Sequence, residues 1–261
     1  MFQSYEFIFA GIPSSMFGLM IYDIDNKSHS DNPFGNVANI LETRIQGRVR
    51  PLHHAVDYYE KPLSFPLIFG SEKELDRWQM QEIAHWLTGY QQYQWLSIEQ
   101  PDLQHVQFRC LITKLTPISV GWGPVAFEAE VTCDCPYAYG YEFEQTFSFA
   151  DGDTIHIFND GTARESCKPK LLITPISGCS NISITNNSDN ARTFSLSNLP
   201  ASSTIYVDND NGIIEEKISN YDLYDGFNDT FFRLIPGENV LVMGGSGEIT
   251  FTGRYFYNTG A

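Results

Sequence analysis

Two segments of the chain alternate apolar and polar residues strictly, and this alternation restricts the possible folds more than any other feature. The alternating apolar side chains are Val106, Phe108, Cys110 and Ile112 in the first segment, and Val125, Phe127, Ala129, Val131 and Cys133 in the second. A period of two places such side chains on one face of an extended strand, as in a half-buried sheet. The sequence therefore predicts a mainly β protein.

Shorter strand signals surround these two segments in the first half of the chain. They are the alternating Tyr5, Phe7 and Phe9, then about Leu19–Ile24, Thr43–Val49, Leu63–Phe69 and Gln94–Glu99. Turn residues separate them, such as Gly11-Ile12-Pro13 after the first. We expect short strands joined by long loops.

One helix is predicted between Ser71 and Gly89. Ser71 followed by Glu74 has the spacing of a capping box, and Gly89 stands where a residue just past the helix end is expected. A broad apolar face contains Leu75, Trp78, Ile83, Trp86 and Leu87. Such a face can pack on the protein's own sheet or close the end of a barrel, and the alternative is that it docks a partner.

The second half of the chain reads as strands separated by turns at the spacing of a β-sandwich. The expected strands are Thr154–Phe158, Lys170–Thr174, Ile182–Thr185, Thr193–Leu196, Ile205–Val207, Ile213–Glu216, Phe231–Leu234, Asn239–Met243 and Ile249–Tyr255. Asn211-Gly212 is a hairpin signal. A domain boundary is expected within Cys135–Glu144, which gives domains of residues 1–142 and 143–261.

The chain carries a net charge of −16, and its two halves contribute equally. This charge disfavours binding to nucleic acid, although an acidic wall would let DNA slide past it. Only 18% of residues are charged, which fits a surface buried in an assembly or a β protein solvated by Thr, Ser and Asn. The N-terminus lacks signal-peptide features, and no apolar run is long enough to cross a membrane. All five cysteines are expected to be small core residues of a protein made in a reducing cytoplasm.

The sequence predicts no catalytic, cofactor-binding or metal-binding residue. His53-His54 lacks further zinc ligands at the usual spacing. Asp208–Gly212 starts like a calcium loop, but its glycine is one position early and no glutamate stands at the twelfth position. Gly244–Gly247 lacks the last glycine of a nucleophile elbow, and no phosphate-binding loop occurs. The acidic pairs Asp151/Asp153 and Glu215/Glu216 are expected by chance among 32 acids.

Carbohydrate binding is the main alternative to a structural role. Sandwich lectins stack an aromatic ring on the sugar, and the second half offers Tyr206, Tyr221, Tyr224 and Tyr255. All four tryptophans precede residue 123, so the preferred stacking residue is missing from this half. Core packing explains most of these tyrosines equally well.

Several short motifs also occur in a fixed order along nearly the whole chain. In the first half they are Phe7–Gly11, Phe17-Gly18, the helix with Trp86-Leu87, and Cys135–Gly140; in the second they are Ile157–Thr162, Lys168–Lys170, Phe231–Asn239 and Gly247–Phe251. With these motifs in this order, the chain resembles the distal tail proteins of phages or prophages of Gram-positive bacteria, in phages with long non-contractile tails. This resemblance implies an N-terminal β-sandwich-like ring, or belt, domain with one α-helix, followed by a galectin-like β-sandwich.

The resemblance also implies a function. Members of this family form a homohexamer, as one ring or two stacked rings, around an axial channel, and they join the tail tube to the host-adsorption apparatus. The implied partners are other copies of the chain, the tail tube protein, a tail-tip or tail-associated protein and a receptor-binding protein, while phage DNA passes without specific binding. The implied location is the tail tip of the virion, after assembly in the host cytoplasm. No enzymatic activity is implied, and no cofactor. The alternative is an adhesion module whose C-terminal sandwich binds a host cell-wall saccharide.

Overall fold

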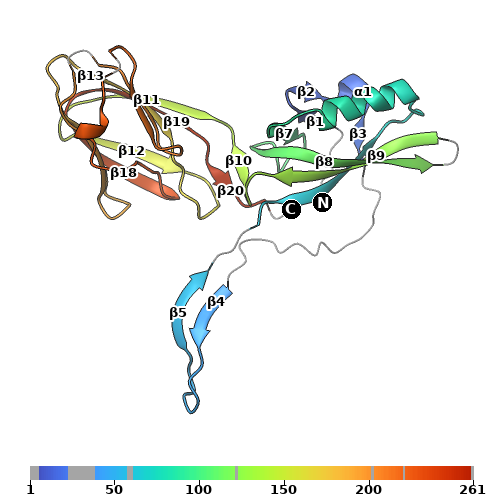
Figure 1. The fold of residues 1–261 in the computed structure, drawn as a ribbon, viewed down its shortest axis with the longest axis horizontal. Coiled ribbons are helices and arrows are strands. Elements are labelled where there is room, and N and C mark those ends of the chain that lie inside the picture. Colours follow the sequence, from blue (N-terminus) through green and yellow to red (C-terminus); the bar gives the residue numbers. More distant parts are fainter. Residues whose placement is uncertain are drawn as a thin grey trace. The chain divides into compact units, whose positions relative to one another are not determined.

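The computed structural model describes residues 6–22, 39–57, 61–120, 123–200, 203–219 and 221–259. The chain divides into two compact units, Met1–Tyr139 together with Asn258–Ala261, and Gly140–Tyr257. Antiparallel strands dominate both units, and the described residues contain one α-helix (Figure 1). The predicted mainly β fold class is confirmed. Tyr5, Ile24 and Trp122 lie outside the described residues.

The N-terminal unit is built on an antiparallel sheet with the strand order β2-β1-β7-β8-β9-β6-β3. Its strands are β1 (Phe7–Phe9), β2 (Ile12–Pro13), β3 (Met20–Ile21), β6 (Ser64–Gly70), β7 (Gln94–Ile98), β8 (Val106–Val120) and β9 (Gly123–Cys133). A 3-10 helix, η1 (Ser14–Phe17), follows β2. The shorter strands β10 (Ala138–Gly140) and β20 (Phe256–Tyr257) lie near the boundary between the units.

Strands β8 and β9 confirm the two alternating segments, and β8 continues well beyond the predicted end. Phe108, Cys110 and Ile112 of β8 are buried as the alternation requires. The pairing of β8 with β9 then shifts register between Ile112 and Lys114. A bulge changes which face the following side chains occupy. The sequence pattern therefore ends at Ile112, although the strand runs on to Val120.

Helix α1 (Arg77–Thr88) begins later than the sequence predicted, because a different capping box forms. The side chain of Asp76 accepts hydrogen bonds from the backbone N–H groups of Trp78 and Gln79, both at 2.8 Å. The Gln79 side chain in turn accepts from the Asp76 N–H at 3.0 Å. The Ser71 hydroxyl accepts instead from the N–H of Lys73, within the preceding turn.

The buried face of α1 packs on the sheet of its own unit, as the structural interpretation of the helix predicted. Ile83, Trp86 and Leu87 are buried. The Trp86 ring stacks on Phe7 and Phe17 with centroid distances of 5.8 and 4.7 Å, and its Nε1–H donates to the carbonyl oxygen of Phe9 at 3.2 Å. The placement of Trp78 on this face was wrong, because its side chain is 78% exposed.

A two-stranded hairpin, which we call the arm, spans Asn39–Asp57. Its strands β4 (Asn39–Thr43) and β5 (Leu52–Asp57) pair with each other in a separate sheet (Figure 1). The predicted strand Thr43–Val49 is wrong, because the chain turns within it. Gly47 adopts φ +87°, and the Arg48 N–H donates to the carbonyl oxygen of Ile45 at 3.1 Å.

The C-terminal unit is a sandwich of two antiparallel sheets. One sheet contains β11 (Phe143–Phe149), β19 (Gly247–Gly253), β13 (Lys170–Pro175), β16 (Ile205–Asp208) and β17 (Ile213–Glu216), in that order. The other contains β12 (Thr154–Asn159), β18 (Gly237–Gly244), β14 (Ile182–Asn186) and β15 (Arg192–Leu196). A 3-10 helix, η2 (Tyr224–Gly226), lies in a connecting loop.

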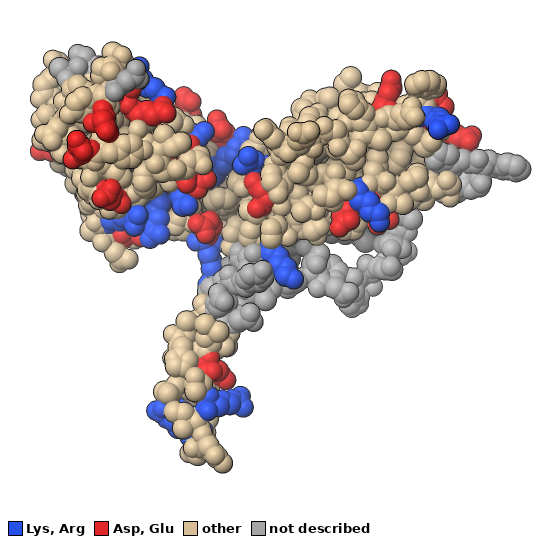
Figure 2. All heavy atoms as spheres, in the orientation of Figure 1, with Lys and Arg blue, Asp and Glu red and all other residues tan. Residues whose placement is uncertain are grey.

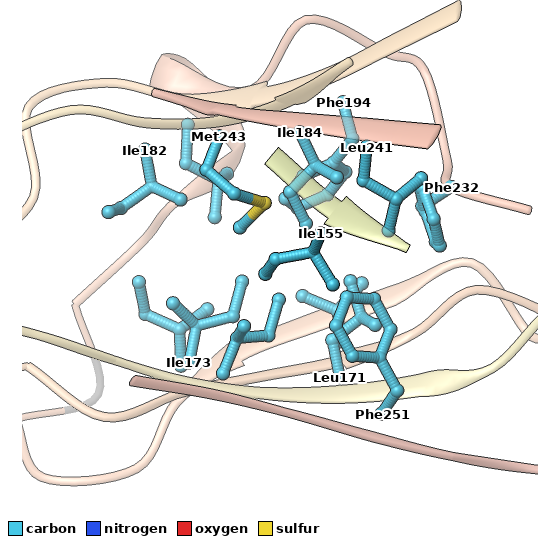
Figure 3. Close-up of a cluster of buried hydrophobic side chains, with 14 of the residues drawn as sticks. Ile155, Leu171, Ile173, Ile182, Ile184, Phe194, Phe232, Leu241, Met243 and Phe251 are labelled. Atoms are coloured by element: carbon cyan, nitrogen blue, oxygen red, sulfur yellow. The ribbon is translucent and has the colours of Figure 1, made fainter. Parts of the chain in front are cut away.

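The core of this unit lies between the two sheets. In Figure 3, Ile155, Ile184 and Met243 of one sheet point toward Leu171, Ile173 and Phe251 of the other. The inward residues alternate with exposed ones along each strand, as in β12 and β13. This is the pattern of a two-sheet sandwich.

Most predicted strands of this unit are present, and the errors have local causes. Residues Phe231–Leu234 do not form a strand, although Phe232 and Leu234 are buried. Side chains hold this segment instead: Asn209 accepts from the Phe232 N–H, and Arg192 donates to the Phe231 carbonyl oxygen. Strand β11 was not predicted, although its Phe143, Phe147 and Phe149 are separated by polar residues.

Candidate assembly surfaces

The residues weighed as metal ligands have structural roles. His54 lies on β5 of the arm, and its Nε2 hydrogen-bonds with the Thr43 hydroxyl at 2.8 Å. The Asp208 carboxylate accepts from the N–H groups of Asp210 and Asn211. In the described part of the chain no three His, Cys, Asp or Glu side chains are grouped to hold a metal ion.

The Asp208–Gly212 segment is the turn between β16 and β17, which confirms the Asn-Gly hairpin signal. Gly212 adopts φ +68°, a conformation that glycine tolerates without strain. Burial of Asp208 opposes its ionisation, but hydrogen bonds from Asn211 and Asp210 outweigh this effect and lower the pKa of its carboxyl. The same hydrogen bonds close the turn.

The acidic pairs do not form a catalytic arrangement. Asp151 accepts from the Gly245 N–H at 3.0 Å and Asp153 from the Ala150 N–H at 2.7 Å, so both stabilise turns. Glu215 and Glu216 alternate on β17, with Glu215 exposed and Glu216 buried. Gly245 adopts φ +87° in the turn between β18 and β19, which accounts for the glycine-rich Gly244–Gly247 segment.

Glu216 is a buried carboxylate whose partners are all in its own unit. It accepts hydrogen bonds from the Ser219 hydroxyl at 2.7 Å, the Ser219 N–H, the Ile218 N–H at 3.0 Å and the Thr204 N–H at 3.2 Å. The Ser219 hydroxyl is the largest cause that lowers the pKa of Glu216, from its ordinary 4.5 to about 2. The carboxylate therefore fixes the loop after β17.

We expect Glu216→Gln to destabilise the C-terminal unit by about 1–3 kcal/mol at pH 7, because the amide cannot accept all of these hydrogen bonds. The folded-state pKa is depressed, so this stabilisation is complete above pH 4.5 and is lost as pH falls toward 2. Scanning calorimetry at pH 7, 4 and 3 should show the difference from wild type shrinking. Glu215→Gln, on the adjacent exposed residue, is the matched control; a loss equal to that of Glu216→Gln would contradict the prediction.

The four tyrosines considered for sugar stacking occupy separate environments. Tyr255 is buried and stacks on Phe143 at 4.5 Å. The Tyr224 hydroxyl accepts from the Ile214 N–H at 3.1 Å, and the Tyr206 ring lies 4.7 Å from the Lys217 Nζ. Tyr221 is exposed. Core packing and loop fixation thus account for Tyr255 and Tyr224.

The prediction that all five cysteines are small core residues holds for three of them and is wrong for Cys135 and Cys179. Cys110, Cys133 and Cys167 are buried, as expected of small core residues. Burial raises the pKa of the Cys133 thiol to about 12, which keeps it protonated at neutral pH. Cys135 and Cys179 are only partly buried. No helix among the described residues is long and apolar enough to cross a membrane.

Exposed large apolar side chains occur in both units of the described chain, and the arm carries the largest group of them. Trp78 of α1 and Met16 of η1 are 78% and 73% exposed. The arm exposes six more large apolar residues, which are Ile40, Leu41, Ile45, Val49, Leu52 and Val56. Surfaces of this kind mark contacts with other proteins. Sequence reasoning missed the arm because its strands are short and its apolar residues face both sides.

Charge is also distributed unevenly. Residues 43–56 of the arm contain Arg44, Arg48 and Arg50 and no acidic residue. The arm also contains Glu42 and Asp57, so Asn39–Asp57 has a net charge of +1 and the rest of the chain, with 13 bases and 30 acids, has −17. Figure 2 shows blue side chains on the lower part of the arm with a red one beside them, and red and blue are also mixed over the larger bodies.

Two family models together match nearly the whole chain. Residues 2–135 match a model described as a phage tail protein N-terminal domain, and residues 137–253 match one described as a phage tail C-terminal domain. The chain belongs to this phage tail protein family. It is therefore a virion component. No curated protein sequence matches this phage tail protein.

Solved structures similar to this phage tail protein come from other phages. The Dit protein of phage SPP1, whose description calls it a paradigm of the hub adsorption apparatus in Gram-positive infecting phages, matches with a TM-score of 0.68 and 10% identity, over 97% of this chain and 100% of that one. A chain of the phage P2 baseplate, in its activated conformation with calcium, matches with a TM-score of 0.50 and 10% identity, over 91% and 90%. At such identity the likeness establishes the fold, which confirms the resemblance to distal tail proteins.

Proposed function

We propose that this protein is the structural hub of a phage tail tip, forming a homohexameric ring around an axial DNA channel. In this role it joins the tail tube to the tip and host-adsorption apparatus and has no catalytic activity. Residues 1–142 form the ring and residues 143–261 are a galectin-like sandwich that attaches partners. The observation that carries the proposal is the fold shared with the SPP1 Dit protein over 97% of this chain and the whole of that one.

The exposed surfaces of the N-terminal unit support self-assembly. A cyclic ring needs two different patches on each copy that fit each other. Exposed Trp78 and Met16 supply apolar contact area of the kind enriched at interfaces. Six copies at −16 would carry −96, so acids must face water or the lumen, where they repel DNA and let it slide.

The implied partners follow from the same role. The tail tube protein would bind one face of the ring, and a tail-tip or tail-associated protein the other. A receptor-binding protein would attach through the C-terminal sandwich, and assembly would take place in the host cytoplasm before the tail tip is complete. A single ring and two stacked rings both satisfy this arrangement.

We expect the intact protein to assemble, with a mass of about 178 kDa for one ring, six times 29.6 kDa, or twice that for two rings. Light scattering with size exclusion chromatography at increasing concentration measures this. A fragment of residues 1–142 should still form rings. A full-length protein that stays monomeric at about 100 μM, well above the concentrations at which specific interfaces form, would overturn the hub proposal.

Saccharide binding is the second candidate, and one observation favours it. Phe158 is 66% exposed on β12, opposite Glu238 of β18, whose carboxylate lies 3.0 Å from the His156 ring. An exposed aromatic ring beside polar side chains can stack on a sugar. Titration with cell-wall saccharides separates the two functions, because saturable binding that Phe158→Ala removes is expected only of the adhesion module.

A further inference from the structure

We propose that the arm binds the acidic surface of a second copy of this chain, and that its arginines make assembly weaken as salt concentration rises. The inference rests on the proposed hub function, which it deepens by naming one contact surface, its partner and a condition that controls it. Three properties of the arm lead to it: its uncovered apolar faces, the three arginines between its strands and the combination of both at its tip.

Both faces of the arm carry apolar side chains that nothing in the described chain covers fully. Ile40 lies opposite Val56 across the two strands, and Leu41 lies opposite Ala55. Neighbouring residues of a strand point to opposite faces, so these two pairs lie on different sides. Ile40 is 63% exposed, and Leu41 is also exposed. A two-stranded hairpin is at best marginally stable alone in water, so the arm needs a binding partner.

The charge of the arm selects the partner. The whole arm, Asn39–Asp57, also contains Glu42 and Asp57 and has a net charge of +1, against −17 for the rest of the chain, but its segment 43–52 holds the three arginines and no acid. In the described part of the chain no carboxylate pairs with Arg48 or Arg50, while Arg44 lies 3.5 Å from Glu42 of the arm itself. Another copy of the chain is acidic overall, with a net charge of −16. Opposite potentials steer such encounters and fix their register.

The tip of the arm combines charge with apolar contact area, which favours a protein partner over DNA. Val49, between Arg48 and Arg50, is fully exposed, and Ile45 follows Arg44. A phosphate backbone would bind the arginines but offer the apolar side chains little contact. A protein surface can bind the arginines and also pack against the apolar side chains. The arm therefore fits another copy of this acidic chain better than it fits the DNA in the channel.

The test compares two triple variants of the full-length protein that have equal net charge. The arm variant is Arg44→Gln/Arg48→Gln/Arg50→Gln, and the control is Lys61→Gln/Lys73→Gln/Arg77→Gln, which removes three exposed cations of the same unit outside the arm. Sedimentation velocity gives the concentration at half assembly at about 50 and 500 mM NaCl, where the Debye length falls several-fold. Circular dichroism checks that each variant is folded.

We expect the arm variant at low salt to need about 10–100-fold more protein for half assembly, whereas the control changes less than about threefold. Salt should weaken assembly of wild type and control. In the arm variant, added salt should strengthen assembly. The attraction of the arginines is gone, so salt then screens only the repulsion between the acidic copies.

Three results would show whether the hub proposal or only the arm inference is wrong. If wild type does not assemble, the hub proposal fails and the arm inference fails with it. If wild type assembles and the arm variant matches the control at both salt concentrations, only the arm inference is overturned. If the arm variant assembles normally but loses binding to a duplex of about 30 base pairs, measured by fluorescence anisotropy, the arm binds phosphate and the inference is also overturned.

Discussion

Replacing Trp86 by alanine should lower the free energy of unfolding of the N-terminal unit by about 3–5 kcal/mol. Trp86 is 5% exposed and is the largest of the three buried residues of α1. Truncation removes stacking on Phe7 and Phe17 and leaves a cavity between helix and sheet. It also leaves the carbonyl oxygen of Phe9 without the indole N–H that donates to it. Urea unfolding followed by the fluorescence of the remaining tryptophans measures the loss.

The matched control is Trp78→Ala on the same helix. Trp78 is exposed, so its removal should change stability by less than about 0.5 kcal/mol. If Trp78 lies in the ring interface, the same substitution should instead weaken assembly. Equal destabilisation by Trp78→Ala and Trp86→Ala would show that α1 does not pack as described.

Replacing Asn239 by alanine should destabilise the C-terminal unit by about 2–4 kcal/mol, because it leaves several buried groups without partners. Its side-chain oxygen accepts from the Asn186 amide at 2.8 Å and the Ile235 N–H at 2.9 Å. Its amide donates to the carbonyl oxygens of Ile235 at 2.8 Å and Gly237 at 3.0 Å. Asn239 is completely buried, so water cannot replace these bonds without rearrangement.

The neighbouring Arg233–Asp189 pair belongs to the same polar network. Arg233 donates to both Asp189 oxygens, at 2.7 and 2.9 Å. Asn186 links the two parts, because its amide also donates to the Arg233 carbonyl oxygen at 3.3 Å. Together these groups hold the irregular loop that leads into β18. Calorimetry of Asn239→Ala, beside the exposed control Asn187→Ala, isolates the contribution of the buried amide; similar melting curves for both variants would contradict it.

Tryptophan fluorescence can assign a loss of stability to one of the two units. The four tryptophans are Trp78, Trp86, Trp95 and Trp122, and none lies in Gly140–Tyr257. Tryptophan emission therefore reports on the N-terminal unit alone. Unfolding of the C-terminal unit is seen by calorimetry and by the near-ultraviolet circular dichroism of its tyrosines.

Sequence reasoning predicted the parts of the fold where local pattern and tertiary burial agree. Strand β17 has the predicted bounds Ile213–Glu216, and β12 and β13 differ from prediction by one residue. Errors occurred where tertiary contacts replace strand pairing. Phe231–Leu234 has the apolar content of a strand, yet Asn209 and Arg192 bind its backbone from other elements. The helix start was wrong because two capping sequences compete, and only Asp76 is completed by Gln79.

The candidate assembly surfaces were harder to predict from the sequence than the strands were. An exposed apolar residue and a buried one look the same in a sequence, so Trp78 was placed with Trp86 on the buried face. The arm gave a weak signal, because the bulge between Leu41 and Glu42 interrupts the alternation of its short strands. Its three arginines in seven residues were visible in the sequence. Only the structure places them on an isolated hairpin.

The chain enters the C-terminal unit at Gly140 and leaves it after Tyr257, and Asn258 again belongs to the N-terminal unit. Both connections of the sandwich therefore lead to the same unit. A genetic exchange with both breakpoints at this junction could replace the whole sandwich as a cassette. The central sheet, α1 and the arm would keep their sequence while the attachment properties of the tail evolve.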